Sequence, residues 1–103
     1  MIKNLTIVGV GLLGGSLGLR LKSRNPDITV TGTGRRKSSL KKALEVGAID
    51  KWTLDPEEAS SQADLIVLCT PVGLIREQAL KFMPYMKKGS VLSDVGSVKK
   101  EII

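Results

Sequence analysis

Three glycines with the spacing G-x-G-x-x-G follow a short apolar run near the start of the chain. The run, Leu5–Val8, is rich in β-branched residues, which is typical of a strand buried on both faces. The glycines are Gly9, Gly11 and Gly14. The first permits a tight turn, the second lets backbone approach a ligand, and the third lets a following helix pack closely on the sheet. We therefore predict a strand–turn–helix unit here.

Strand-like apolar runs alternate with helix-like segments along the rest of the chain. We expect strands at Leu5–Val8, Ile28–Thr31, a short part of Ala48–Leu54, Leu65–Cys69 and Ser90–Ser93. We expect helices from the third glycine to Asn25, from a cap at Ser38 or Ser39 to a stop at Gly47, from Asp55-Pro56 to about Gln62, and over Leu74–Met83. Buried strands joined by helices indicate a parallel sheet covered on both faces. We predict an α/β fold, a doubly wound parallel sheet of the Rossmann-like class, filling residues 1–103 as one domain.

The composition excludes several kinds of catalytic and metal site. The chain of 103 residues has one Cys and no His. Zinc sites of the common types and nucleophiles activated by His are therefore excluded within it, and we predict no metal site. No apolar run reaches the length of about 18 residues that suggests a membrane helix, and no signal-peptide pattern is present. We expect a cytoplasmic protein without a membrane partner.

The position of the glycine motif between a strand and a helix predicts a dinucleotide site. In such units the pyrophosphate lies at the helix N-terminus, where free N–H groups point at the anion. The alternative is an ordinary glycine-rich turn. The residues of this loop that we predict to bind a cofactor are Gly9, Gly11, Leu12, Leu13 and Gly14.

A second loop follows the most apolar strand at its carboxyl end, which is where ligands bind in open α/β sheets. We expect it to contact the cofactor through backbone groups, and the residues concerned are Cys69, Thr70, Pro71 and Val72. Alternatively, Pro71 only ends the strand. Cys69 by itself is most simply interpreted as a small buried apolar residue.

The end of the second strand is where a residue that reads the ribose is expected. A protein that prefers NAD has Asp or Glu there to bind the 2′-hydroxyl, whereas this chain has Gly34 followed by Arg35 and Arg36. A 2′-phosphate accepts charge-assisted hydrogen bonds from Arg, each worth about 1.5–3 kcal/mol. We therefore predict NADP rather than NAD, with Ser38 as a further contact. The alternative is that this basic run is a solvated charged surface.

The net charge of +6 raises the question of a nucleic-acid partner. The cations are dispersed along the chain, no recognition motif accompanies them, and aromatic residues make up only 3% of the sequence. Stacking platforms for single strands are therefore few. We expect no nucleic-acid partner.

Four segments together resemble the prephenate/arogenate dehydrogenases of tyrosine biosynthesis, and the resemblance covers the whole chain. These segments are Ile7–Leu17, Glu45–Asp50, Ala63–Val72 and Leu92–Lys99. The first is shared with many dehydrogenases. The block Asp94–Lys99 is much more particular to this family.

The resemblance implies an oxidative decarboxylation of prephenate or arogenate, with hydride transfer to the nicotinamide. It implies that Ser97 helps to hold the substrate and a catalytic His, and that the full-length protein is a homodimer. It also implies that the sixth strand, the catalytic His and a helical substrate and dimerisation domain lie beyond these residues. We therefore expect the 103 residues alone to bind nucleotide without dehydrogenase activity, and they do not distinguish prephenate from arogenate.

Two alternatives to this function remain open at the level of the sequence. One is an NADP-dependent reductase or hydroxyacid dehydrogenase of another family, which would share the glycine loop and the apolar fourth strand. The other is a non-enzymatic nucleotide-sensing module, which the lack of a His base allows.

Overall fold

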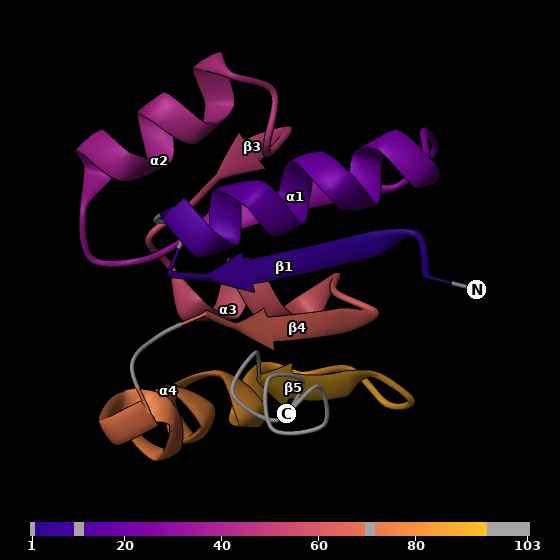
Figure 1. Cartoon of the computed structure of the whole chain (residues 1–103). Helices are drawn as coiled ribbons and strands as arrows, with labels where there is room; N and C mark the ends of the chain where they lie inside the picture. Colours follow the sequence, from indigo (N-terminus) through magenta and orange to yellow (C-terminus); the bar gives the residue numbers. More distant parts are fainter. Residues whose placement is uncertain (1, 10–11, 70–71, 95–103) are drawn as a thin grey trace, which may run out of the picture.

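The computed structural model describes residues 2–9, 12–69 and 72–94. Their strands form one parallel sheet in the order β3-β2-β1-β4-β5 (Figure 1). The strands are β1 (Asn4–Val8), β2 (Thr29–Thr33), β3 (Lys51–Trp52), β4 (Leu65–Leu68) and β5 (Val91–Asp94). The helices are α1 (Leu12–Arg24), α2 (Lys37–Glu45), α3 (Pro56–Ser61) and α4 (Ile75–Phe82), with short 3₁₀ turns η1 (Val72–Leu74) and η2 (Met83–Tyr85).

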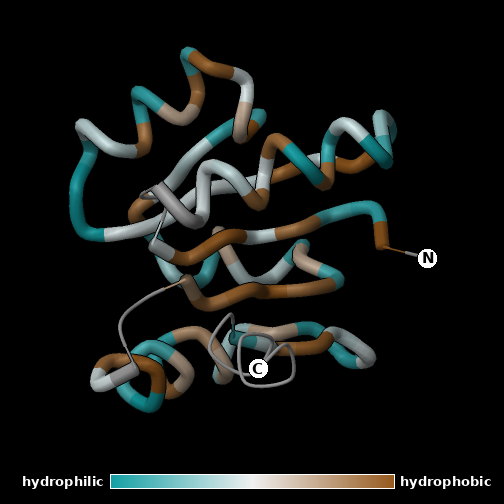
Figure 2. The backbone as a smooth tube through the Cα atoms, viewed as in Figure 1, coloured by the Kyte–Doolittle hydropathy of each residue, from teal (hydrophilic) through white to brown (hydrophobic). Residues whose placement is uncertain are grey.

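Helices cover both faces of the sheet. Successive residues of a strand point to opposite sides, so the apolar central strands present an apolar surface on each face. Leu5 and Ile7 of β1 belong to one buried cluster with residues of α2, and Leu17 and Leu21 of α1 pack against that cluster. Val8 belongs to the other cluster, which contains residues of α3, β4 and α4. Figure 2 shows the resulting hydrophobic colour along β4. The predicted doubly wound α/β fold is confirmed.

The predicted elements are confirmed with small shifts at their ends. The second strand extends to Thr33, the last strand is Val91–Asp94, one residue later than predicted, and the ambiguous third segment contains the short β3. Asp55 caps α3, since its carboxylate accepts the N–H of Glu57 at 3.0 Å. None of the helices in the described ranges is long and apolar enough to cross a membrane.

The predicted serine cap of α2 is wrong, whereas the predicted glycine stop is confirmed. The helix begins at Lys37, and Arg36 is its extended N-cap without a side-chain cap bond. Ser38 and Ser39 therefore lie inside the first turn, because the chain turns into the helix earlier than the serine pattern suggests. At the other end Gly47 has φ +80° and donates its N–H to Leu44, while Ala48 donates to the carbonyl of Ala43. These bonds make a Schellman motif.

Two carboxylates fix the amino edge of the sheet. Asp64, just before β4, accepts the N–H groups of Lys3 and Asn4 at 2.9 Å each and pairs with Lys87 at 2.7 Å. Asp50, just before β3, accepts the N–H of Val30 at 2.8 Å and pairs with a Lys of α1. The acidic groups that hold strands together thus lie at the edge where the strands begin.

Helix α1 packs against the rest of the fold through a glycine face. A Cβ atom added to Gly18 would lie 2.2 Å from the carbonyl oxygen of Ala48. A Cβ added to Gly15, one turn earlier on the same helix, would meet nothing within 4 Å. Close backbone packing of the helix therefore requires glycine at position 18 but not at position 15.

We predict that Gly18→Ala destabilises the protein by about 1–3 kcal/mol, because backbone must move to admit the methyl group. Gly15→Ala is the matched control and should stabilise the protein by about 0.5–1 kcal/mol, since alanine loses less backbone entropy in a helix. Urea denaturation of both variants measures the difference. Equal stability of the two variants would contradict the close packing of α1.

Asp64 predicts a specific loss of stability in acid. The hydrogen bond from Lys87 and those from the N–H groups of Asn4 and Lys3 hold the pKa of Asp64 well below its ordinary value. A folded-state pKa below the unfolded one gives stability that is present above the unfolded pKa, about 3.9, and is lost as the pH falls below it.

We therefore expect Asp64→Asn to flatten the pH dependence of the unfolding free energy below about pH 4. Lys87→Gln should keep the part of the slope that comes from the two backbone N–H bonds. Denaturant unfolding between neutral and acid pH measures both variants. A wild-type slope in Asp64→Asn would show that this carboxylate does not control acid stability.

Candidate functional site

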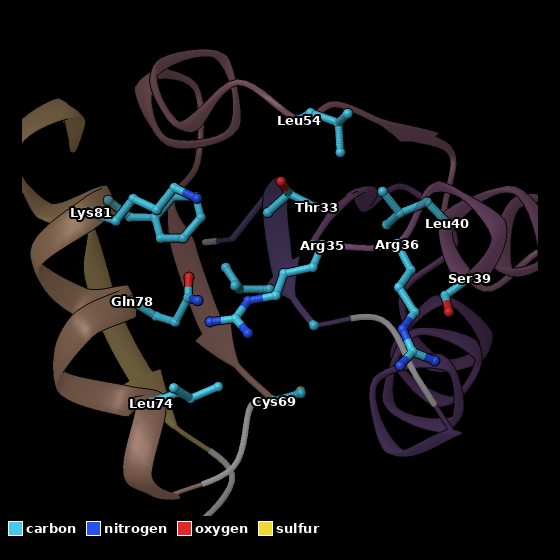
Figure 3. Close-up of a pocket in the computed structure, with 14 residues that line it drawn as sticks. Thr33, Arg35, Arg36, Ser39, Leu40, Leu54, Cys69, Leu74, Gln78 and Lys81 are labelled. Atoms are coloured by element: carbon cyan, nitrogen blue, oxygen red, sulfur yellow. The ribbon is translucent and has the colours of Figure 1, made fainter.

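A pocket of about 390 Å³ opens at the carboxyl edge of the sheet (Figure 3). The ends of β1, β2 and β4 contribute Val8, Gly9, Thr33, Gly34 and Cys69 to its lining. Arg35, Arg36, Ser39 and Leu40 line the side next to α2, and Leu74, Gln78, Lys81 and Phe82 line the side next to α4, with Leu54 between them. The strand order changes direction at β1, so the pocket lies where open α/β sheets bind ligands.

Gly9, the first glycine of the motif, lines this pocket. Gly9 has φ +85° and donates its N–H to the carbonyl of Thr33 at 2.8 Å, so the turn joins the ends of β1 and β2. A Cβ on Gly14 would lie 2.9 Å from the carbonyl oxygen of Gly9 and 3.2 Å from the Cγ2 atom of Ile7. The predicted role of Gly14 in helix packing is therefore confirmed, although it does not line the pocket. Leu12 begins α1.

Part of the basic segment after β2 lines the pocket. Gly34, Arg35 and Arg36 line it, and no carboxylate stands at the end of β2. Ser38 does not line the pocket, whereas Ser39 does. Because α2 begins at Lys37, Ser39 and Leu40 fall on the side of the helix that lines the pocket and Ser38 does not.

Cys69 occupies the wall at the end of β4. Its N–H donates to the carbonyl of Val8 at 2.8 Å, and its side chain is half-buried. Burial raises the pKa of the Cys69 thiol to about 11. The thiol is therefore protonated near neutral pH and acts as an apolar part of the wall rather than as a nucleophile.

Several predicted site residues lie where the structure gives no side-chain description. Gly11, Thr70, Pro71 and Ser97 are outside the described residues. The backbone of Leu13 lies in the first turn of α1, and that of Val72 begins η1. Their roles stay predictions.

The sequence reasoning missed the side of the pocket formed by α4. Gln78 and Lys81 are three positions apart, which places them on one face of the helix. Gln78 is only 7% exposed, although Gln is a polar residue. The position of Gln78 among the apolar residues of an amphipathic helix is a signal of its burial, but not of a ligand beside it.

The pocket is electropositive. Arg35, Arg36 and Lys81 line it, and no Asp or Glu is found among its described lining residues. In the described part of the chain, neither arginine forms an ion pair with a carboxylate. Nor do those residues contain a group of three His, Cys, Asp or Glu side chains that could hold a metal ion. The arrangement suits an anionic organic ligand.

Comparison with known proteins indicates the family. A family model described as prephenate dehydrogenase, nucleotide-binding domain, matches residues 17–103. Cyclohexadienyl dehydrogenase of Zymomonas mobilis is 33% identical over 103 residues, which is 100% of this chain and 35% of that protein. Prephenate dehydrogenase of Lactococcus lactis is 29% identical, over 99% of this chain and 28% of that protein. The chain thus spans about a third of the length of these curated relatives.

Solved structures agree with this relationship. Synechocystis arogenate dehydrogenase superposes with a TM-score of 0.81 at 31% identity, covering 88% of this chain and 32% of that one. Prephenate dehydrogenase from A. aeolicus, in complex with hydroxyphenyl propionate and NAD+, gives a TM-score of 0.83 at 30% identity, covering 91% and 33%. The resemblance inferred from the sequence is confirmed, and the chain belongs to the family of prephenate dehydrogenase nucleotide-binding domains.

Proposed function

We propose that this chain is the NADP(H)-binding domain of a dehydrogenase that oxidises and decarboxylates prephenate or arogenate. The observation that carries the cofactor proposal is the pocket at the carboxyl edge, which has three cations in its lining and no described acidic residue. The substrate class is supported by the names of relatives, which are prephenate, cyclohexadienyl and arogenate dehydrogenases.

The residues present fit a nucleotide that carries an additional phosphate. Gly34 leaves the end of β2 without a carboxylate that would repel a 2′-phosphate. Figure 3 shows Arg36 beside Ser39 on the α2 side of the pocket. A guanidinium and a hydroxyl supply donors for phosphate oxygens, and Arg binds such groups in a bidentate manner. We assign Arg36 and Ser39 to the 2′-phosphate.

The glycine loop would hold the pyrophosphate. Gly9 turns the chain sharply between β1 and α1, and Gly14 brings the start of α1 close to β1. The helix N-terminus then offers N–H groups to an anion. When bound, the nicotinamide supplies the hydride acceptor of the reaction, and Ser97 remains our predicted residue on the substrate side.

The A. aeolicus relative was solved with NAD+, so the choice between the two cofactors needs a direct test. A charge-assisted hydrogen bond is worth about 1.5–3 kcal/mol, which corresponds to about tenfold or more in affinity. Our proposal therefore requires NADPH to bind at least about tenfold more tightly than NADH.

We predict that Arg36→Ala weakens NADPH binding about tenfold or more and changes NADH binding much less, because only NADPH carries the 2′-phosphate. Lys37→Ala is the matched control, since Lys37 belongs to the same basic run but does not line the pocket. Isothermal titration with both nucleotides measures all four affinities. If Lys37→Ala and Arg36→Ala lose equal NADPH affinity, the basic run acts only as a diffuse charged surface.

We also expect the 103-residue chain to show no turnover of prephenate or arogenate with NADP⁺, because it contains no His to act on the substrate hydroxyl. Absorbance of NADPH measures the reaction, and titration of the same sample shows whether nucleotide is bound. Turnover above the rate without protein would overturn this expectation.

A further inference from the structure

We propose that Gln78 reads the adenine ring of the bound nucleotide and selects it against bases that lack the 6-amino group. The proposal rests on the proposed function and deepens it, because it assigns the base end of the cofactor to the α4 side of the pocket. The juxtaposition that carries it is a buried amide facing a cavity that also contains the Arg35 guanidinium.

The burial of Gln78 is unusual for an amide without a partner. Gln78 lines the pocket and is 7% exposed, and its side-chain amide forms no hydrogen bond with the described residues. Figure 3 shows the amide pointing into the pocket toward Arg35. The amide is open to the pocket, so a ligand that supplies both a donor and an acceptor can form hydrogen bonds with it.

The lining of the pocket offers surfaces for a flat heterocycle. Leu54, Leu74 and Phe82 contribute apolar surface to the pocket lining. Figure 3 shows the Arg35 side chain pointing toward the Gln78 side of the pocket. Arginine stacks on aromatic faces through its planar, weakly hydrated cation, so Arg35 can cover one face of a base whose edge meets Gln78.

Adenine matches an amide at its N6/N7 edge. The exocyclic N6 amino group donates and N7 accepts, whereas the amide oxygen of Gln78 accepts and its nitrogen donates. Hypoxanthine has a carbonyl oxygen in place of the amino group, so the same edge then presents two acceptors. Only one of these can be satisfied by the amide nitrogen while its oxygen faces another oxygen. Adenine therefore gains a hydrogen bond to the amide oxygen at position 6, where hypoxanthine meets a repulsion between two oxygen atoms.

The test compares NADPH with its hypoxanthine analogue, reduced nicotinamide hypoxanthine dinucleotide phosphate, by isothermal titration. We expect the wild-type protein to bind the analogue about tenfold more weakly than NADPH. Gln78→Leu should weaken NADPH binding about tenfold and bring the two ligands within about twofold of each other. The preference for NADPH over NADH should remain in this variant, because it depends on Arg36.

Two controls keep the result decisive. Gln62→Leu makes the same change at the exposed C-cap of α3 and should keep the wild-type ratio of the two affinities. Gln78→Met keeps the length of the side chain but has neither the amide donor nor the amide acceptor, so it should bring the two ligands within about twofold of each other even if Gln78→Leu fails to fold.

The outcomes separate this proposal from the proposed function. If wild-type protein binds NADPH and the hypoxanthine analogue equally, or if Gln78→Met keeps the wild-type ratio, the assignment of Gln78 is overturned while NADPH binding stands. If wild-type protein binds no nicotinamide nucleotide, both proposals fail.

Discussion

The close approach of α1 to the sheet determines where the pocket can lie. Gly14 brings the start of this helix to the Gly9 turn, and Gly18 brings its middle against the Ala48 carbonyl. Neither contact leaves room for a side chain. Helix α1 therefore packs closely against β1. The ends of β1, β2 and β4 line the pocket at the carboxyl edge of the sheet.

Charged side chains lie at both edges of the sheet. Asp64 and Asp50 lie where strands begin and bind backbone N–H groups there. The cations Arg35, Arg36 and Lys81 lie around the pocket where strands end. The carboxylates satisfy donors that the sheet leaves unpaired, whereas a ligand with several phosphates would complement the cations around the pocket. The gathering of these three cations at one pocket supports an anionic cofactor more strongly than the net charge does.

The features that the sequence predicts well depend on residues close together in the chain. The Gly9 turn, the Gly47 stop and the position of Arg35 and Arg36 follow from short patterns whose meaning does not depend on distant residues. The serine contact is less predictable, because the face that Ser38 or Ser39 presents depends on where the backbone turns from β2 into α2.

The α4 side of the pocket depends on the whole topology. Gln78 lines the same pocket as Arg35 and Arg36 because β4 lies next to β1 in the sheet and α4 packs on the cluster that contains Val8 and residues of β4. A pattern of apolar residues predicts the helix, but the sequence alone does not identify which polar residue on it faces a ligand. The fold was therefore predictable to within a residue or two at the element ends, whereas the far wall of the site required the tertiary structure.

The central claim is that the adenosine end of NADP(H) lies between the α2 and α4 sides of the pocket. An NMR titration with 2′,5′-ADP tests it most directly, with 5′-AMP as the matched ligand lacking the 2′-phosphate. The account predicts that 2′,5′-ADP shifts the amide signals of residues 33–39 and 78–82, and that 5′-AMP at the same concentration affects 36–39 much less. Shifts confined to other surfaces, or equal shifts of 36–39 with both ligands, would contradict it.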